Sequence, residues 1–208
     1  MLAIGYVKML IDVHYKLQHK MKLVILDRDG VINYDSDNYI RSVAQWLPIP
    51  RSIEAIANLS KAGYLIAIAT NQSGIARQYY SLDVLQAMHD KMEYLVAEAG
   101  GTINCIVYCP HLADDHCRCR KPKPGMLHQI LKRLESQGHA QSTDADIWFV
   151  GDSLKDLQAG ISAGFKTGLV KTGKGLITLA DPRLPPNTPI FTDLADFSHR
   201  LLSNAKTE

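Results

Sequence analysis

Apolar stretches with the length of β-strands alternate along this chain with segments of helical spacing. The apolar stretches cover residues 22–26, 64–69, 103–108, 146–150 and 165–170. The helical segments cover residues 53–62, 82–99, 125–137 and 154–163. Because the apolar stretches are nearly continuous, each strand is expected to be buried on both faces. This order predicts an α/β fold, with a doubly wound parallel sheet and flanking helices.

The spacing between these elements also limits what else the chain can hold. A shorter strand is predicted at residues 190–192 and a last helix at 194–202. Gly63, Gly100 and Gly164 follow predicted helices, where glycine commonly ends a helix. The intervals between strands leave room for loops and single helices, and not for an inserted cap domain. We expect one domain over residues 21–208.

The first 20 residues differ from the rest of the chain. They have a loose helical spacing of apolar residues, but Lys8, Asp12 and His14 interrupt any signal-peptide core. Met21 then opens the first predicted strand. We expect residues 1–20 to be an upstream extension outside the fold, arising from an early start. An amphipathic helix packed on the domain is the alternative.

Composition excludes several classes of protein. Of the 208 residues, 46% are hydrophobic and 21% charged, as in ordinary globular proteins and unlike disordered ones. Lys and Arg (23) nearly balance Asp and Glu (21), so nothing favours a nucleic-acid partner. No apolar run approaches the roughly 20 residues of a membrane span. We expect a cytoplasmic monomer without a membrane partner.

Carboxylates follow two of the predicted strands. Asp27 and Asp29 come directly after residues 22–26, and Asp152 comes after residues 146–150. In an open parallel sheet, reactive groups gather beyond the carboxyl ends of the strands, where the strand order reverses. If the first and fourth strands are neighbours, Asp27 and Asp152 meet there. Carboxylates this close need a cation, and their hard oxygen atoms suit Mg²⁺.

Groups that could bind phosphate follow other strands of the same sheet. Thr70 ends the second predicted strand and precedes a polar turn at residues 71–77, which offers a hydroxyl and free backbone N–H groups. Arg120 and Lys121 come just before a predicted helix. Lys121 can neutralise both the aspartates and a phosphoryl group, and Arg120 can bind phosphate through two hydrogen bonds.

Each of these motifs also has a simpler interpretation. Asp29 could be only a turn residue before glycine. Asp156 is expected to form a capping box with Ser153. The segment after Thr70 could be an ordinary strand-to-helix loop, and residues 120–125 a solvated basic turn. It is the combination of complementary groups at several strand ends that favours a site.

The four cysteines are clustered between positions 105 and 119. Three thiols and one imidazole follow the pattern C-x-H-x₅-C-x-C at Cys109, His111, Cys117 and Cys119. Such a set suits a closed, tetrahedral, structural Zn²⁺ site. Cys105 lies within a predicted strand and is expected in the core. His116 as a substitute ligand, or a disulfide between Cys109 and Cys119, are the alternatives.

Four separated segments together resemble the motifs of the haloacid dehalogenase (HAD) superfamily of phosphotransferases. In chain order they are DRDGVIN, ATNQSGIAR, CRKPKPG and VGDSLKDLQAG. The resemblance implies a Mg²⁺-dependent phosphatase with an aspartyl-phosphate intermediate. Asp27 would attack phosphorus, and Asp29 would act as general acid and then base. Mg²⁺ would be bound by Asp27, the Asp29 main-chain carbonyl and Asp152. The transferring oxygens would be held by Thr70, the N–H of Asn71 and Lys121.

Within that superfamily, the chain resembles the D-glycero-D-manno-heptose-1,7-bisphosphate 7-phosphatases. That family supplies precursors of ADP-heptose and GDP-heptose for bacterial lipopolysaccharide and related glycans. The resemblance implies contacts to a small phosphorylated sugar at Asp35, Asn38, Thr70, Asn71, Gln72, Ser73, Arg120 and Lys121. Two departures affect sugar recognition, namely a short loop between His111 and Cys117, and Ser153 where some relatives have lysine.

Two other functions are compatible with these motifs. Histidinol-phosphate phosphatases form a sister group with a similar zinc loop, but tend to differ after Thr-Asn-Gln. A phospho-receiver or silent binding module also has Asp, Thr and Lys at strand ends. A receiver needs no second aspartate like Asp29 and has no zinc loop.

Overall fold

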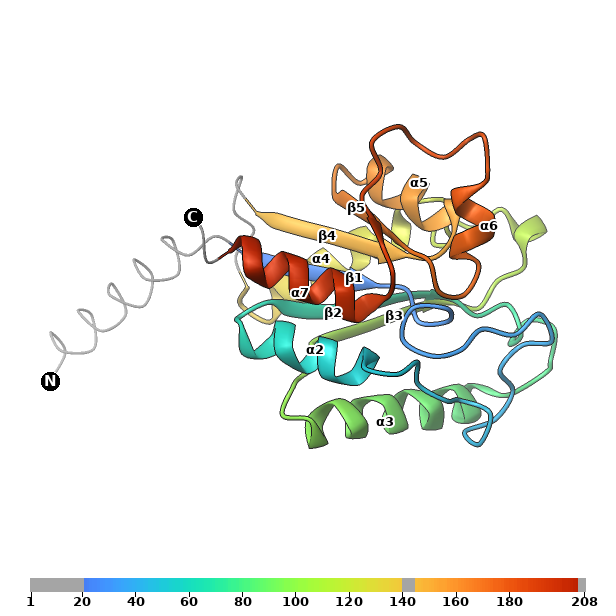
Figure 1. Cartoon of the computed structure of the whole chain (residues 1–208). Coiled ribbons are helices and arrows are strands. Elements are labelled where there is room, and N and C mark those ends of the chain that lie inside the picture. Colours follow the sequence, from blue (N-terminus) through green and yellow to red (C-terminus); the bar gives the residue numbers. More distant parts are fainter. Residues whose placement is uncertain (1–20, 140–144, 206–208) are drawn as a thin grey trace, which may run out of the picture.

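The first strand of the domain lies in the middle of a six-stranded sheet (Figure 1). In the computed structural model, which describes residues 21–139 and 145–205, the strand order is β3-β2-β1-β4-β5-β6 and every adjacent pair is parallel. The strands are β1 (Lys22–Leu26), β2 (Leu65–Asn71), β3 (Cys105–Cys109), β4 (Asp146–Gly151), β5 (Lys166–Val170) and β6 (Ile190–Phe191). The predicted doubly wound parallel sheet is confirmed. The predicted extension at residues 1–20 lies outside the described residues.

Alternate residues of β1 pack on opposite faces of the sheet. Leu23 and Ile25 belong to one apolar cluster and Val24 and Leu26 to the other, and all four are fully buried. The Val24 face is covered by α2 (Ser52–Lys61), α3 (Leu82–Glu98) and α7 (Leu194–Asn204). The Leu23 face is covered by α4 (Gly125–Ser136) and α5 (Leu154–Ser162). Burial on both faces is what the continuous apolar sequence of β1 predicted.

The observed elements begin and end close to the predicted bounds. Gly63, Gly100 and Gly164 have φ angles of +84°, +79° and +77°, so each takes the left-handed conformation just after a helix. Two short elements were not predicted, the 3₁₀ helix η1 (Ala113–Asp115) and the helix α6 (Gly175–Leu179). Each is too short to give a periodic signal in the sequence.

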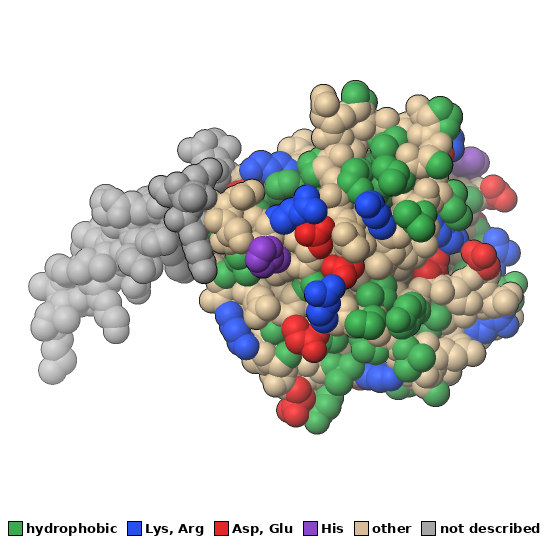
Figure 2. Space-filling model, in the orientation of Figure 1, with side chains coloured by type: hydrophobic (Ala, Val, Ile, Leu, Met, Phe, Trp, Pro, Cys, Tyr) green, Lys and Arg blue, Asp and Glu red, His purple; other side chains and the backbone are tan. Residues whose placement is uncertain are grey.

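The outer surface has no region of a single charge sign on the face shown in Figure 2. Basic and acidic side chains are interspersed there with apolar ones, as the near balance of charges in the sequence predicts. Among the described helices, none combines the length and the apolar character needed to cross a bilayer.

The long loop between β1 and α2 packs around its own apolar side chains. Trp46 and Ile32 are fully buried. Lys91 of α3 donates hydrogen bonds from Nζ to the carbonyl oxygens of Val43 at 3.1 Å and Trp46 at 2.8 Å. The loop is therefore anchored to α3 where it lies beside the carboxyl end of β1. No cap domain interrupts the described residues between β1 and β2, as predicted.

Candidate active site

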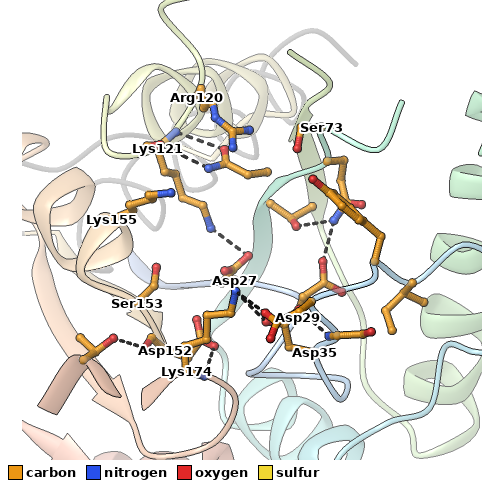
Figure 3. Close-up of a pocket in the computed structure, with 18 of the residues that line it drawn as sticks. Asp27, Asp29, Asp35, Ser73, Arg120, Lys121, Asp152, Ser153, Lys155 and Lys174 are labelled. Atoms are coloured by element: carbon orange, nitrogen blue, oxygen red, sulfur yellow. Dashed lines mark hydrogen bonds and ion pairs between the residues drawn. The ribbon is translucent and has the colours of Figure 1, made fainter. Parts of the chain in front are cut away.

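Three aspartates meet beyond the carboxyl ends of β1 and β4, and Figure 3 shows two of them, Asp27 and Asp152. Asp27 follows β1, Asp152 follows β4, and Asp156 lies in the first turn of α5. One carboxylate oxygen of each lies within 4.8 Å of the others. The Asp27 N–H donates to the Val150 carbonyl at 2.9 Å, which ties the two strand ends together. The sequence analysis predicted that Asp27 and Asp152 would meet, but gave Asp156 only a helix-capping role.

Lys121 forms ion pairs with two of these aspartates. Its Nζ lies 2.8 Å from Asp27 Oδ1 and 2.6 Å from Asp156 Oδ1, and donates to the Ala69 carbonyl at 2.9 Å. Only 3% of the side chain is exposed. Burial alone would lower the pKa of Lys121, but the charges of Asp156 and Asp27 outweigh it and raise that pKa. Lys121 is therefore a permanent buried cation.

The three aspartates carry more charge than Lys121 can balance. Burial, reinforced by Asp156 and opposed by Lys121, raises the pKa of Asp27 to about 7. Burial and the charges of Asp156 and Asp27 raise the pKa of Asp152 to about 8. When all three carboxyls are ionised, they face one ammonium and leave two excess negative charges. Their hard oxygen atoms and this excess fit a divalent cation such as Mg²⁺.

Asp156 is already engaged on both of its oxygens. Oδ1 pairs with Lys121, and Oδ2 accepts hydrogen bonds from the Ser153 hydroxyl and from the Ser153 N–H at 3.0 Å. The predicted interaction between Ser153 and Asp156 is thus present, together with an ion pair that the local sequence could not reveal. Asp27 and Asp152 are the side chains better placed to hold the cation.

The loop before α6 and the turn after β1 enclose the Asp152 carboxylate. Gly30, with φ +81°, and Gly173 both lie so close to Asp152 Oδ2 that a Cβ atom on either would overlap it. The Lys174 N–H donates to Asp152 Oδ2 at 2.8 Å, and the Thr178 hydroxyl donates to the Asp152 carbonyl at 2.8 Å. None of these residues around Asp152 was predicted from the sequence, where the Gly-Lys-Gly run at 173–175 was the available signal.

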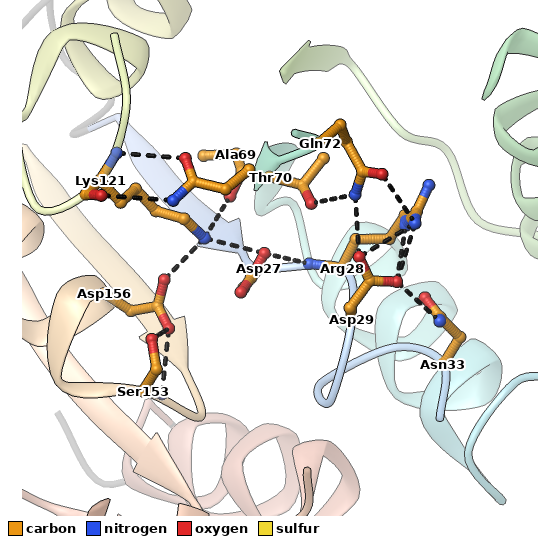
Figure 4. A network of polar contacts seen from close by, with 11 residues as sticks. Asp27, Arg28, Asp29, Asn33, Ala69, Thr70, Gln72, Lys121, Ser153 and Asp156 are labelled. Carbon is orange, nitrogen blue, oxygen red and sulfur yellow. Dashed lines mark hydrogen bonds and ion pairs between the residues drawn. The ribbon is translucent and has the colours of Figure 1, made fainter. Parts of the chain in front are cut away.

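Asp29 lies on the other side of Asp27, and Arg28 connects the two: its N–H donates to Asp27 Oδ1 at 2.7 Å and its side chain binds Asp29 (Figure 4). Asp29 accepts hydrogen bonds from Arg28 Nη2 at 2.8 Å, Asn33 Nδ2 at 2.9 Å and Gln72 Nε2 at 2.8 Å. Burial alone would raise the pKa of Asp29, but Arg28 and these hydrogen bonds hold it below its ordinary value. Asp29 is therefore a carboxylate in the resting protein. Its predicted main-chain contact to Mg²⁺ stays a prediction.

The Arg28 guanidinium also contacts a buried histidine, His89. Arg28 Nη1 lies 3.5 Å from His89 Nε2, and His89 is only 2% exposed. Burial, aided by the nearby Arg28 charge, lowers the pKa of His89 to about 4. His89 is therefore neutral at physiological pH.

The predicted phosphate-binding residues lie around the same carboxylates. Thr70 is buried at the end of β2. The Lys121 N–H donates to Asn71 Oδ1 at 3.1 Å, and Asn71 Nδ2 donates back to the Lys121 carbonyl at 3.3 Å, so the two loops are joined. The resulting cavity has a volume of about 410 Å³. Its walls include most predicted substrate contacts: Asp35, Thr70, Asn71, Gln72, Ser73, Arg120 and Lys121. Asn38 lies outside it and borders a neighbouring hollow.

Three further basic side chains line this cavity, namely Arg120, Lys155 and Lys174. Lys174 lies opposite the loop after β1, with Nζ 3.6 Å from Asp35 and 3.2 Å from Asp37. Arg120 Nη1 donates to the His111 carbonyl at 3.1 Å, so Arg120 and Lys174 would exchange contacts at the rim to bind a second anionic group of a ligand.

The predicted zinc ligands form one compact group. The three Sγ atoms of Cys109, Cys117 and Cys119 lie 3.3–3.6 Å apart. His111 Nδ1 lies 3.5 Å from Cys109 Sγ and 3.3 Å from Cys119 Sγ. Tetrahedral bonds of about 2.0–2.3 Å to Zn²⁺ place ligand atoms about 3.5–3.8 Å apart, so the group fits this ion.

Cys105 and His116 lie outside this group of four possible zinc ligands. Cys105 packs in the core on the Leu23 face, as predicted. His116 does not join the ligand group. All four cysteines, which are within the described residues, are free thiols, so the alternative of a disulfide is not supported.

Comparisons with known proteins agree with this geometry. A family model described as HAD-hyrolase-like matches residues 118–197. The chain is 58% identical over 181 residues to the D-glycero-beta-D-manno-heptose-1,7-bisphosphate 7-phosphatase of Pseudomonas aeruginosa, covering 86% of this chain and 97% of that protein. It is 56% identical over 182 residues to the same enzyme of Pseudomonas putida, covering 88% and 100%.

A solved structure is similar as well. The crystal structure of D,D-heptose 1.7-bisphosphate phosphatase from B. bronchiseptica, complexed with magnesium and phosphate, superposes with a TM-score of 0.82 at 46% identity, covering 88% of this chain and 99% of that one. The sheet, the strand-end aspartates and these matches define a HAD-type hydrolase. Within that class, the chain belongs to the D-glycero-beta-D-manno-heptose-1,7-bisphosphate 7-phosphatase family.

Replacing two of the thiols should remove the zinc. In Cys117→Ser/Cys119→Ser, too few strong ligands are left, so we expect loss of bound zinc and a Tm lower by about 10 °C, because structural zinc contributes several kcal/mol to folding. Elemental analysis and thermal unfolding measure both. Cys105→Ala, outside the ligand group, should keep the metal. One zinc per chain in the double variant would contradict the assignment.

The buried neutral His89 should make stability depend on pH. Its pKa is about 4 in the folded chain against 6.5 in a free side chain, so its contribution is complete above pH 6.5 and is lost as pH falls toward 4. Between pH 7.5 and 4.5, urea unfolding should show that the wild type loses about 2–3 kcal/mol more than His89→Gln.

The control for this measurement is His128→Gln, an exposed position on α4. It should follow the wild type at every pH. Equal losses in the wild type and His89→Gln would show that His89 is not held neutral by the fold.

Proposed function

We propose that this chain is a Mg²⁺-dependent phosphatase that removes the 7-phosphate from D-glycero-β-D-manno-heptose 1,7-bisphosphate. The observation that carries the proposal is the meeting of Asp27, Asp152 and Lys121 in an open cavity at the carboxyl edge of the sheet. Support for the substrate comes from relatives with that name at 58% and 56% identity, and from the similar enzyme solved with magnesium and phosphate.

The first chemical step would transfer the phosphoryl group to Asp27. An Asp27 carboxylate oxygen attacks phosphorus as the bond from phosphorus to the sugar oxygen breaks. Asp29 delivers a proton to that leaving oxygen. Asp29 is a carboxylate in the resting protein, so it must first take this proton from solvent as the dianionic phosphate of the substrate binds nearby and raises its proton affinity. Mg²⁺ held by Asp27 and Asp152 would supply positive charge that offsets repulsion between nucleophile and phosphate.

The second step would release the phosphate. A water molecule loses a proton to Asp29 while its oxygen attacks phosphorus and the Asp27–phosphorus bond breaks. Lys121 neutralises the charge on the transferring oxygens, and Thr70 and the Asn71 N–H provide hydrogen bonds to them. Lys121 suits this role because its buried ammonium is already fixed between Asp27 and Asp156.

The cavity also has a place for the second phosphate of such a substrate. Arg120, Lys155 and Lys174 line its walls, and all three are more exposed than the buried Lys121. Lys174 has its charge shared with Asp35 and Asp37 at the rim. We expect the 1-phosphate to compete with these rim carboxylates for the basic side chains.

The proposal includes a monomeric enzyme in the cytoplasm. The four cysteines form no disulfide, which is usual for proteins of that reducing compartment.

The substrate can be identified by a phosphate-release panel. With Mg²⁺ present, the β-heptose 1,7-bisphosphate should give the highest kcat/KM, above the α anomer and above histidinol phosphate by at least about tenfold, an energy difference of about 1.4 kcal/mol. Faster turnover of histidinol phosphate would assign the chain to that reaction instead. A stable aspartyl-phosphate without repeated turnover would identify a receiver-like module.

Removing the nucleophile should abolish turnover. Asp27→Asn leaves an amide that attacks phosphorus poorly, so kcat should fall by about 10⁴-fold or more, and no phosphoenzyme should form in an acid-quench assay. Asp83→Asn, an exposed aspartate on α3, serves as the matched control and should retain full activity. A normal rate in Asp27→Asn would exclude Asp27 as the nucleophile.

A further inference from the structure

Arg28 is a buried cation bound to the carboxylate of its neighbour. Its Nε donates to Asp29 Oδ1 at 3.1 Å, and its Nη2 donates to Oδ1 at 2.8 Å and to Oδ2 at 3.0 Å. Only 1% of the Arg28 side chain is exposed. A buried ion pair loses so much hydration that apolar residues of similar size often stabilise a fold as well or better. The pair therefore calls for a reason beyond stability.

Gln72, which directly follows β2, binds the same Asp29 carboxylate. Its Nε2 donates to Asp29 Oδ2 at 2.8 Å and to Thr70 Oγ1 at 2.7 Å. Its Oε1 accepts from the Tyr80 hydroxyl at 2.6 Å and from Arg28 Nη2 at 3.2 Å. Because Oε1 faces two donors, Nε2 must face Asp29, so the orientation of the amide is fixed. All of its polar atoms are used inside the protein.

These contacts determine where the Asp29 carboxylate lies. Oδ1 is held by Arg28 and Asn33, and Oδ2 by Arg28 and Gln72. Although Asp29 is two residues from Asp27, it is not part of the group in which Asp27, Asp152 and Asp156 approach within 4.8 Å. It still lines the cavity. The network keeps a fourth carboxylate facing the cavity but apart from the cation-binding ones.

We propose that Arg28 and Gln72 are positioning residues that hold the Asp29 carboxylate for proton transfer and away from the metal-binding aspartates. This inference rests on the proposed function, in which Asp29 gives a proton to the sugar oxygen and later takes one from water. It also assigns the Gln72 amide to Asp29 and not to the substrate. The Arg28 main-chain N–H donates to Asp27 Oδ1 at 2.7 Å, and a substitution of the side chain leaves this contact in place. No contact joins the side chain of Arg28 or Gln72 to Asp27, so we assign the effect of each side chain to Asp29.

The test compares substrates with different needs for a proton. The sugar phosphate releases an alkoxide that must be protonated, whereas p-nitrophenyl phosphate releases a stable phenolate. In Arg28→Met, kcat for the heptose bisphosphate should fall by about 10²-fold or more. The first turnover of p-nitrophenyl phosphate should slow far less. Because hydrolysis of the aspartyl-phosphate also needs Asp29, a burst of p-nitrophenolate should appear and phosphoenzyme should accumulate.

Two comparisons separate positioning from a merely structural role. In the Asp29→Asn background, Arg28→Met should lower kcat by less than about threefold further, because the group that Arg28 positions is already absent. Lys91→Met removes a partly buried cation that anchors the β1–α2 loop without touching Asp29, and should change neither substrate preference nor burst. If Arg28→Met does not fold by circular dichroism, Gln72→Leu replaces it in both experiments.

Each outcome has a definite meaning. Equal losses on both substrates without phosphoenzyme, or multiplicative effects of Arg28→Met and Asp29→Asn, would overturn the positioning role. Failure of the wild type to hydrolyse heptose bisphosphate would overturn the proposed function alone, because the burst measured with p-nitrophenyl phosphate still tests Arg28.

Discussion

Electrostatic repulsion among aspartates at the end of β1 and β4 is the constraint around which this molecule is organised. Asp27, Asp152 and Asp156 are brought within 4.8 Å of one another with Lys121 between two of them. Such a cluster is unfavourable by itself, because burial penalises each charge and the charges oppose one another. A rigid scaffold must therefore impose it. The parallel sheet does so, since its strands end side by side and release their next residues at one edge.

The scaffold also separates the acidic groups by chemical task. On one side of Asp27, glycines and the turn before α6 fit tightly around Asp152, leaving an oxygen-rich place suited to a cation. On the other side, Arg28 and Gln72 saturate Asp29 with hydrogen bonds. Asp27 and Asp29, which are separated by a single residue, thus have opposite environments: the pKa of Asp27 is raised and that of Asp29 is lowered. The side chains packed around each carboxylate distinguish them, because the two residues are chemically the same.

This explains which parts could be predicted from the sequence. The strands and the meeting of Asp27 with Asp152 follow from patterns that act over whole elements, namely continuous burial and strand-end placement. The zinc ligands follow from a short spacing. By contrast, the direction of the Gln72 amide depends on Tyr80 and Arg28, and the second partner of Asp156 is Lys121, far away in the chain. Local patterns carry no signal for such pairings, and α6 is too short for one.

Lys174 connects the rim of the cavity with its interior. Its main-chain N–H binds Asp152, while its side chain meets Asp35 and Asp37 on the facing loop. Under the proposed function, the loop that would contact the sugar and the carboxylate that would bind Mg²⁺ thus share one residue. Because the contact to Asp152 comes from the main chain, the side chain at position 174 can be exchanged without removing that hydrogen bond. Evolution could therefore remodel the entrance for a different sugar while it retains the support of the carboxylate proposed to hold the metal.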